Sequence, residues 1–203
     1  YMDKDNFCLL GQSWGGILAM EYALKYQDNL KGLIISNMMA SIPEYEKYAE
    51  VLGAQLPPEV YKEIKELEAK EDFSNPRYAE LVMNNYYTEH ILRKPLDEWP
   101  EFINRAFSHI YMQGYSEFGV TGNATLKGWG VSDRLKEIKT PTLMIGGKYD
   151  TMDPKYMEWM STEVQDGRSL TVNAGHVSQY DDPVNYFSGL IKFIKDVDNG
   201  SFK

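Results

Sequence analysis

The chain has a single cysteine, Cys8, among its 203 residues. One cysteine excludes an internal disulfide, so the fold does not depend on an oxidising compartment. Cys8 lies in an apolar segment, which is typical of a buried structural thiol rather than a reactive one. The sequence also has only three histidines and no Cys/His cluster with the spacing of metal ligands, so we expect neither a metal nor a cofactor.

Positive charge and long apolar runs are also scarce. Lys and Arg total 21 against 30 Asp and Glu, which gives a formal net charge of −9. Nucleic acids and anionic membrane surfaces are bound by basic patches, so we expect neither as a partner. No apolar run approaches the ~18 residues that a membrane-spanning helix requires. The 43% of hydrophobic residues nevertheless indicates a globular chain that can bury a core, as one large domain or one domain with an insertion.

Nothing at the beginning of the chain has the pattern of a signal peptide. Residues 1–6 are mostly polar and are typical of a loop that leads into a strand. Any targeting signal would lie in a preceding segment. From the residues given, we favour the cytoplasm.

The main motif of the sequence is the pentapeptide Gly11-Gln12-Ser13-Trp14-Gly15, of the form G-x-S-x-G. An apolar run at 7–10 precedes it and a helix-compatible run at 17–26 follows it. A strand, a sharp turn and a helix form the context of a nucleophile elbow, in which the serine is the reactive residue. About one chain in fifteen of this length would carry the pattern by chance, as a glycine-rich turn with a bystander serine. The flanking segments favour the elbow.

The segments after the elbow predict a sheet interrupted by helices. An apolar, β-branched segment at 33–35 follows the first helix, and a helix between two strands favours a parallel sheet. From about 41 to 130 the strand pattern disappears and helical segments such as 59–71 take over. We therefore divide the chain into a core part at 1–40, a helical lid at 41–130 and a second core part at 131–203.

The second core part repeats the strand and helix pattern. Strands are predicted at 141–147 and 169–173. Asp153-Pro154 and Asp182-Pro183 each place an N-cap aspartate before a first-turn proline, so both pairs should begin helices. The apolar residues that we expect the last of these helices to bury are Phe187, Leu190, Ile191 and Ile194.

A serine hydroxyl becomes a useful nucleophile only beside a base that is itself oriented by an acid. In folds with a nucleophile elbow these residues follow the order serine, acid, histidine. His90 and His109 lie in helical segments of the lid, where we expect surface or structural roles. His176 lies in a loop directly after the last strand and is the predicted base.

Asp150 is the predicted acid, because it lies just past the end of a strand, at the sheet edge where ligands bind in open α/β folds. Asp153 is the competitor, although capping a helix already explains it. The backbone N–H of Trp14 should supply one half of the oxyanion hole. The second donor should come from a His-Gly-Gly type of loop before the elbow, and the chain has no His-Gly pair.

Several strands that precede the elbow in an α/β-hydrolase fold are also lacking, since only twelve residues come before Ser13. The fold class predicted here is therefore α/β, corresponding to the C-terminal part of an α/β-hydrolase fold with an inserted helical lid. We expect an N-terminal part as a partner, either as a missing segment of the same protein or as a separate chain.

The sequence resembles the proline iminopeptidases and the tricorn-interacting aminopeptidase along essentially its whole length. The lid segments are the more specific part of this resemblance, because many α/β-hydrolases share the elbow. The similar segments are Gly11–Gly16, Lys25–Ile34, Asn75–Tyr78, Glu98–Pro100, Gly147–Asp150 and Gly175–His176. The resemblance implies the removal of an N-terminal residue, often proline, from short peptides.

The resemblance also implies that lid glutamates hold the substrate's ammonium or imino group. The segment 113–118 resembles the stretch that carries one of them, which points to Glu117. A carboxylate beneath a lid is a suitable counter-ion for a buried cation, and a surface glutamate is the alternative. The residues before Glu117 differ from the usual Gly-Pro-Asn, and Thr151 stands where the tricorn-interacting enzyme has a second glutamate.

We therefore expect a serine aminopeptidase that releases proline or other small or apolar residues from short peptides or aminoacyl substrates. Ser13 would attack the first carbonyl, with His176 as base and Asp150 orienting it. An amino-acid amidase or esterase on the same scaffold is the alternative, as is a catalytically incomplete fragment that needs an N-terminal half. Epoxide hydrolases and dehalogenases are not expected, since they use an aspartate where Ser13 stands.

Overall fold

A four-stranded sheet with the order β1-β2-β5-β6 organises the chain, and its neighbouring strands all run parallel. The computed structural model describes residues 5–103, 105, 115–116, 119–120 and 126–202. Each of the four strands lies where the sequence predicts one. Their bounds are Phe7–Gln12 for β1, Leu30–Ser36 for β2, Thr142–Gly147 for β5 and Gly167–Val172 for β6.

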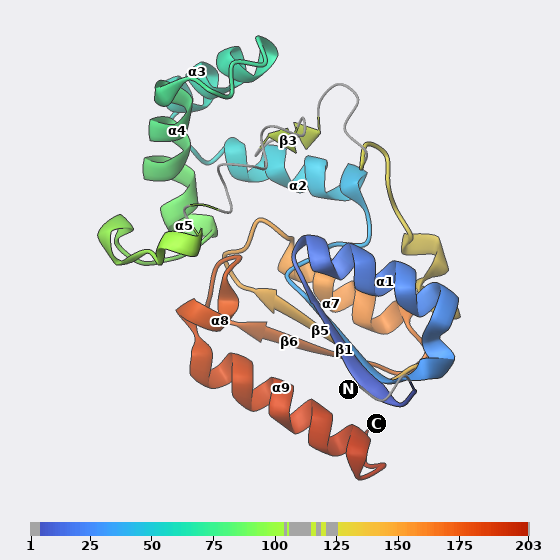
Figure 1. The fold of residues 1–203 in the computed structure, drawn as a ribbon. Coiled ribbons are helices and arrows are strands. Elements are labelled where there is room, and N and C mark those ends of the chain that lie inside the picture. The colour runs from blue at the N-terminus through green and yellow to red at the C-terminus, as the bar shows by residue number, and fades with distance from the viewer. Residues whose placement is uncertain (1–4, 104, 106–114, 117–118, 121–125, 203) are drawn as a thin grey trace.

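Helices cover both faces of this sheet (Figure 1). Helices α1 (Trp14–Tyr26) and α7 (Pro154–Glu163) lie on one face, and α9 (Pro183–Asp198) lies on the other. The two-residue period of a strand explains the division, because successive side chains point to opposite faces. In β2, Leu33 and Ile35 pack into the cluster beneath α1, whereas Ile34 packs into the cluster beneath α9.

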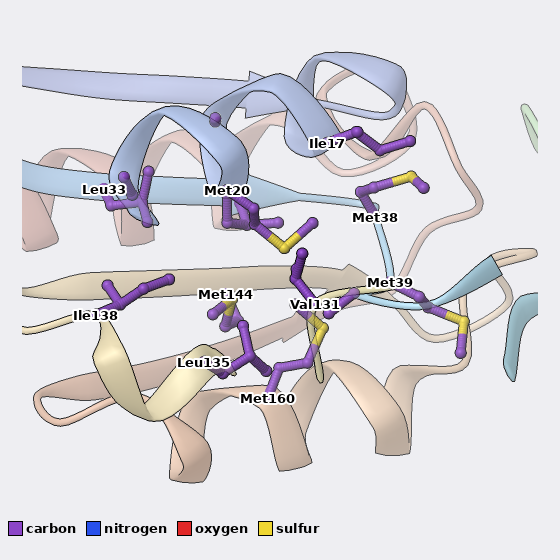
Figure 2. Close-up of a cluster of buried hydrophobic side chains, with 14 of the residues drawn as sticks. Ile17, Met20, Leu33, Met38, Met39, Val131, Leu135, Ile138, Met144 and Met160 are labelled. Carbon is purple, nitrogen blue, oxygen red and sulfur yellow. The ribbon is translucent and has the colours of Figure 1, made fainter. Parts of the chain in front are cut away.

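The cluster beneath α1 and α7 is rich in methionine (Figure 2). Met20, Met38, Met39, Met144 and Met160 are each no more than 4% exposed. Unbranched thioether side chains fill irregular gaps, and complete burial of each contributes about 1.5–3 kcal/mol. This cluster supports the first turns of α1, and with them the serine that precedes the helix.

The two aspartate–proline pairs begin helices as predicted. Asp153 accepts a hydrogen bond from the N–H of Lys155 at 2.9 Å, and Asp182 accepts one from the N–H of Asn185 at 3.4 Å. In each case the proline is the first residue of the helix, where a missing N–H costs nothing.

The predicted buried stripe of α9 is partly wrong. Phe187 and Ile191 are 46% and 49% exposed, whereas Tyr186 and Phe193 are buried against the sheet. Both sets recur at helical spacing, because α9 is apolar on two sides. Periodicity alone therefore could not select the side that faces the sheet.

The lid is built mainly from helices. They are α2 (Ile42–Gly53), α3 (Pro58–Ala69), α4 (Pro76–Val82), a π-helical turn at Met83–Tyr87 and α5 (Thr88–His90). Aromatic side chains such as Tyr78, Tyr87 and Trp99 give this region a hydrophobic cluster of its own. Figure 1 shows α2–α5 apart from the helices that cover the sheet, with α5 beside the loop that leads into α8 (Ser178–Asp181).

The expectation that segment 41–130 contains no strand is wrong at one place. Two-residue strands β3 (Tyr115–Ser116) and β4 (Gly119–Val120) pair in antiparallel fashion. Strands of this length are too short to produce a periodic pattern. Short 3-10 turns lie at Gln27–Asn29, Leu96–Glu98 and Ser132–Glu137. Within the described ranges, no helix has the length and apolar character needed to cross a bilayer.

Candidate active site

Ser13 occupies a sharp turn between β1 and α1. Its backbone has φ of 53° and ψ of −128°, a conformation that costs a non-glycine residue about 1–3 kcal/mol. The turn is held by a hydrogen bond from the N–H of Ser13 to the carbonyl of Ser36 at 2.9 Å, and by one from the N–H of Gly16 to the carbonyl of Ser13 at 2.7 Å. This strained strand–turn–helix geometry is that of a nucleophile elbow.

Close packing around the elbow explains two of its three glycines. A Cβ on Gly11 would overlap the carbonyl of Gly15 and lie 2.7 Å from the Cβ of Ala19. A Cβ on Gly16 would lie 2.6 Å from the Cβ of Met38. A Cβ on Gly15 would meet no atom within 4 Å. The sequence pattern G-x-S-x-G thus contains one glycine that packing requires, and a second required glycine lies just outside it.

The structure brings Ser13, His176 and Asp150 together. The Nε2 atom of His176 lies 2.7 Å from Ser13 Oγ, and its Nδ1 atom lies 2.8 Å from Asp150 Oδ1. Asp150 is fully buried and His176 is 7% exposed. Because an ionised carboxylate can only accept hydrogen bonds, the Nδ1–H of a neutral His176 points at Asp150 and leaves Nε2 to accept the serine proton. This is the order of contacts that a nucleophile, a base and an orienting acid require.

Asp150 receives hydrogen bonds on both carboxylate oxygens. Oδ1 also accepts from the N–H of Met152 at 3.1 Å and from the hydroxyl of Thr151 at 3.3 Å. Oδ2 accepts from Nδ2 of Asn37 at 2.6 Å. Asp153, the competing acid, instead caps α7. Sequence reasoning missed Asn37, although it follows a parallel strand beside β5 and so had to lie at the same sheet edge as Asp150.

The loop that carries His176 is attached to the lid. The N–H of His176 donates to the carbonyl of His90 at 2.8 Å, and the N–H of Val177 donates to the carbonyl of Ile91 at 2.8 Å. The ring of His90 reaches the acid loop, with Nδ1 2.7 Å from the carbonyl oxygen of Tyr149. Burial lowers the pKa of His90 below its usual value, so the neutral ring donates its Nδ1–H to that carbonyl. His90 therefore has a structural role within reach of both loops.

Asp181, in α8, forms a second link between lid and loop. Its Oδ2 accepts from the N–H of Gly175 at 2.8 Å, and its Oδ1 accepts from the N–H of Arg93 at 2.9 Å. Burial raises the pKa of Asp181, and these two hydrogen bonds oppose that rise. The guanidinium of Arg93 also lies over the ring of Tyr149, 3.8 Å from its centroid. Sequence reasoning assigned Asp181 no role, because its partners are remote in the sequence.

Trp14 is the first residue of α1, so its backbone N–H has no acceptor within the helix and remains available beside Ser13. Its side chain is 55% exposed. Glu117 and His109 lie outside the described residues. Among the residues that are described, no group of three or more His, Cys, Asp or Glu side chains is arranged to hold a metal ion.

Comparison with known proteins gives one family model, described as alpha/beta hydrolase fold, that matches residues 1–183. A proline iminopeptidase of Elizabethkingia meningoseptica is 57% identical over 209 residues, covering 100% of this chain and 70% of that protein. A proline iminopeptidase of Flavobacterium johnsoniae is also 57% identical, covering 97% of this chain and 68% of that protein.

Two solved structures are similar over nearly the whole chain. The crystal structure of VinJ superposes with a TM-score of 0.86 at 28% identity, covering 96% of this chain and 67% of that one. The crystal structure of a Mycobacterium smegmatis proline iminopeptidase superposes with a TM-score of 0.82 at 30% identity, covering 97% of this chain and 67% of that one. These similarities include the lid as well as the sheet.

Proposed function

Because this chain belongs to the proline iminopeptidase family of the α/β-hydrolase fold, we propose that it is a serine hydrolase that releases N-terminal proline from short peptides. The observation that carries the proposal is the hydrogen-bonded series Ser13, His176 and Asp150 on a nucleophile elbow. The fold alone would not be sufficient to assign this activity, since enzymes with unrelated activities share the same scaffold.

The geometry supports acyl transfer in two steps. Ser13 Oγ attacks the carbonyl carbon of the first residue while His176 Nε2 takes the hydroxyl proton. The tetrahedral intermediate collapses when His176 returns that proton to the leaving amine, and the peptide bond breaks. Water then attacks the acyl-enzyme by the same route, with His176 again as base, and releases the free amino acid and Ser13. Asp150 keeps the imidazole oriented and stabilises its positive charge in each step.

The N-terminus of α1 supplies electrostatic stabilisation of the tetrahedral oxyanion. We assign the N–H of Trp14 as one donor, because it follows the nucleophile and has no acceptor within the helix. The positive end of the helix dipole reinforces it. Removing one such donor from comparable sites costs about 2.7–4 kcal/mol of transition-state stabilisation.

A free N-terminus on the substrate is the second part of the proposal. A carboxylate under the lid would pair with the ammonium or imino group, and the sequence resemblance assigns this role to Glu117. Such pairing would make the enzyme an exopeptidase, because a blocked N-terminus carries no charge to be bound.

Two measurements on the intact protein test the proposal. Ser13→Ala should abolish both covalent labelling by a fluorophosphonate and hydrolysis of proline p-nitroanilide. Persistent labelling would show that Ser13 is not the nucleophile. Proline p-nitroanilide should be cleaved faster than its N-acetyl analogue and faster than simple esters. Equal cleavage of the blocked and free anilides would contradict exopeptidase action and favour an amidase or esterase.

A further inference from the structure

Asn37 is a buried polar residue at the carboxyl end of β2. Its side chain is fully buried, and its backbone has φ of 53°, a conformation that asparagine adopts more readily than most residues. Its own N–H donates to the carbonyl of Ile145 at 2.8 Å, so the turn stays attached to β5. Asn37 is thereby held at the sheet edge where the loop of Asp150 begins.

The amide of Asn37 has partners on three segments of the chain. Its Oδ1 accepts from the hydroxyl of Ser36 at 2.7 Å. Its Nδ2 donates to Asp150 Oδ2 at 2.6 Å and to Ser178 Oγ at 2.8 Å. The hydroxyl of Ser178 in turn donates to the carbonyl of Gly175 at 2.8 Å. Because a carboxylate only accepts, the nitrogen of the amide must face Asp150, which fixes the orientation of the amide.

We propose that Asn37 is a positioning residue for the Asp150–His176 pair, an inference that rests on the proposed serine hydrolase function. By holding Oδ2 of Asp150, the amide leaves Oδ1 directed at Nδ1 of His176. Through Ser178, the same amide also holds the carbonyl of Gly175, the residue before His176. The side chain of Asn37 thus fixes the position of Asp150 relative to the loop that carries His176.

The chemistry of the site requires an amide at position 37 rather than a carboxylate. A buried carboxylate needs hydrogen-bond donors on both oxygens, and among the described residues Asn37 is the one whose side chain donates to Oδ2 of Asp150. Without that donor, Oδ2 of Asp150 is a buried acceptor with no side-chain donor in the described part of the chain, while Oδ1 keeps its hydrogen bonds from Met152 and Thr151. An aspartate at position 37 would place a second negative charge at hydrogen-bond distance and oppose the ionised form of Asp150.

The variants Asn37→Asp and Asn37→Gly test this role in the otherwise unchanged protein. Aspartate matches asparagine in shape, and both replacements tolerate the positive φ. The main readout is the rate of Ser13 labelling by a fluorophosphonate between about pH 5.5 and pH 8.5, because labelling needs the activated serine but no proline-specific contact. The kcat and KM for proline p-nitroanilide give the second readout.

At about pH 8 we expect Asn37→Asp to be labelled about 10- to 100-fold more slowly than the wild type, with a similar fall in kcat and an unchanged KM. The deficit of Asn37→Asp should shrink as the pH falls, since one proton shared by the two carboxyl groups restores a donor to Asp150. Asn37→Gly cannot regain a donor, so its deficit should be the same at every pH.

Tyr186→Phe is the matched control. The Tyr186 hydroxyl donates to Ser36 Oγ at 3.1 Å, and Ser36 and Asn37 separate it from Asp150 in the same hydrogen-bond network. Its loss should therefore change labelling less than about two-fold. Wild-type labelling of Asn37→Asp, or a deficit that does not vary with pH, would overturn the inference. Failure of the wild-type protein to be labelled would instead overturn the proposed serine chemistry. If Asn37→Gly does not fold, the pH profile of Asn37→Asp decides alone.

Discussion

The Nδ1 atom of His90 lies 2.7 Å from the carbonyl oxygen of Tyr149, so a lid helix is bonded directly to the loop that carries Asp150. The backbone carbonyl of the same histidine accepts the N–H of His176 at 2.8 Å. One lid residue therefore contacts both the acid loop and the histidine loop. The end of α5 therefore helps to hold the catalytic loops in place. Any movement of the lid must leave this end fixed or move the two loops together with it.

A lower pH should weaken the attachment of His90 to the loops of Tyr149 and His176. Burial is the largest effect and lowers the pKa of His90; the hydrogen bond to the carbonyl of Tyr149, Glu89 and Asp150 favour the charged form without overcoming burial, and Arg93 opposes it. A released His90 binds a proton more readily than the packed one, so the attachment is fully stable above about pH 6.5 and weakens as the pH falls below that value. Hydrogen exchange of the amides of residues 176 and 177, corrected for intrinsic rates, should accelerate between about pH 7.5 and pH 5.5.

The control for that experiment is His90→Asn, whose Nδ2 matches the position of the histidine Nδ1 and retains a donor for the carbonyl of Tyr149 but does not titrate. The variant should lose the pH dependence of exchange at residues 176 and 177. If wild type and variant respond identically to pH, the titrating group is not His90.

Replacement of Asp181 should loosen the histidine loop from the other side. Asp181→Ala leaves the N–H groups of Gly175 and Arg93 without their acceptor, so we expect a loss of about 1–3 kcal/mol in the free energy of unfolding and a lower kcat. Asp181→Asn keeps one acceptor oxygen and should fall between the alanine variant and the wild type. Urea denaturation and steady-state kinetics measure the two effects. An alanine variant as stable and active as the wild type would show that solvent replaces these bonds without cost.

Two adjacent glycines of the elbow should respond differently to alanine. Gly16→Ala forces a Cβ against Met38 at 2.6 Å, so we expect a loss of about 1–3 kcal/mol of stability. Gly15→Ala places its Cβ in open space within α1 and should be neutral or stabilising by up to about 1 kcal/mol. Thermal unfolding of the two variants gives the comparison directly. Equal melting temperatures would mean that Met38 moves aside freely.

Replacement by asparagine should distinguish the roles of Asp150 and Asp153. Asp150→Asn removes the negative charge beside His176 and allows the wrong tautomer, so kcat should fall about 10⁴-fold. Asp153→Asn preserves an N-cap acceptor for Lys155, and both activity and stability should remain close to wild type. Steady-state kinetics on proline p-nitroanilide provide the measurement. A larger loss for Asp153→Asn would reverse the assignment of the acid.

Local signals explain why the sheet and the group of Ser13, Asp150 and His176 could be predicted. The elbow is a five-residue pattern flanked by a strand and a helix, and the other two residues each follow a predicted strand. Parallel strands end at one edge of a sheet, so their C-terminal loops must lie close together. The fold class is confirmed by the family model and by the superposed structures.

The residues that sequence reasoning missed depend on pairs that no local pattern records. Asn37 contacts a carboxylate 113 residues away, and the contact between Asp181 and Arg93 spans 88 residues. Neither asparagine after a strand nor aspartate in a short helix is unusual by itself. The prediction that Phe187 is buried failed for a similar reason. Packing against the sheet selects which side of α9 is buried, and composition alone does not record that packing.

The hydrogen bond between Ser13 and His176 joins residues 163 positions apart. A ribosome adds about 5–20 residues per second, so the serine is made roughly ten to thirty seconds before its base. The sheet must also receive β6, its last strand, before His176 can reach the elbow. This topology delays peptidase activity until β6, the strand before His176, has been synthesised and paired with β5. A nascent chain that lacks this strand therefore cannot cleave the peptides around it.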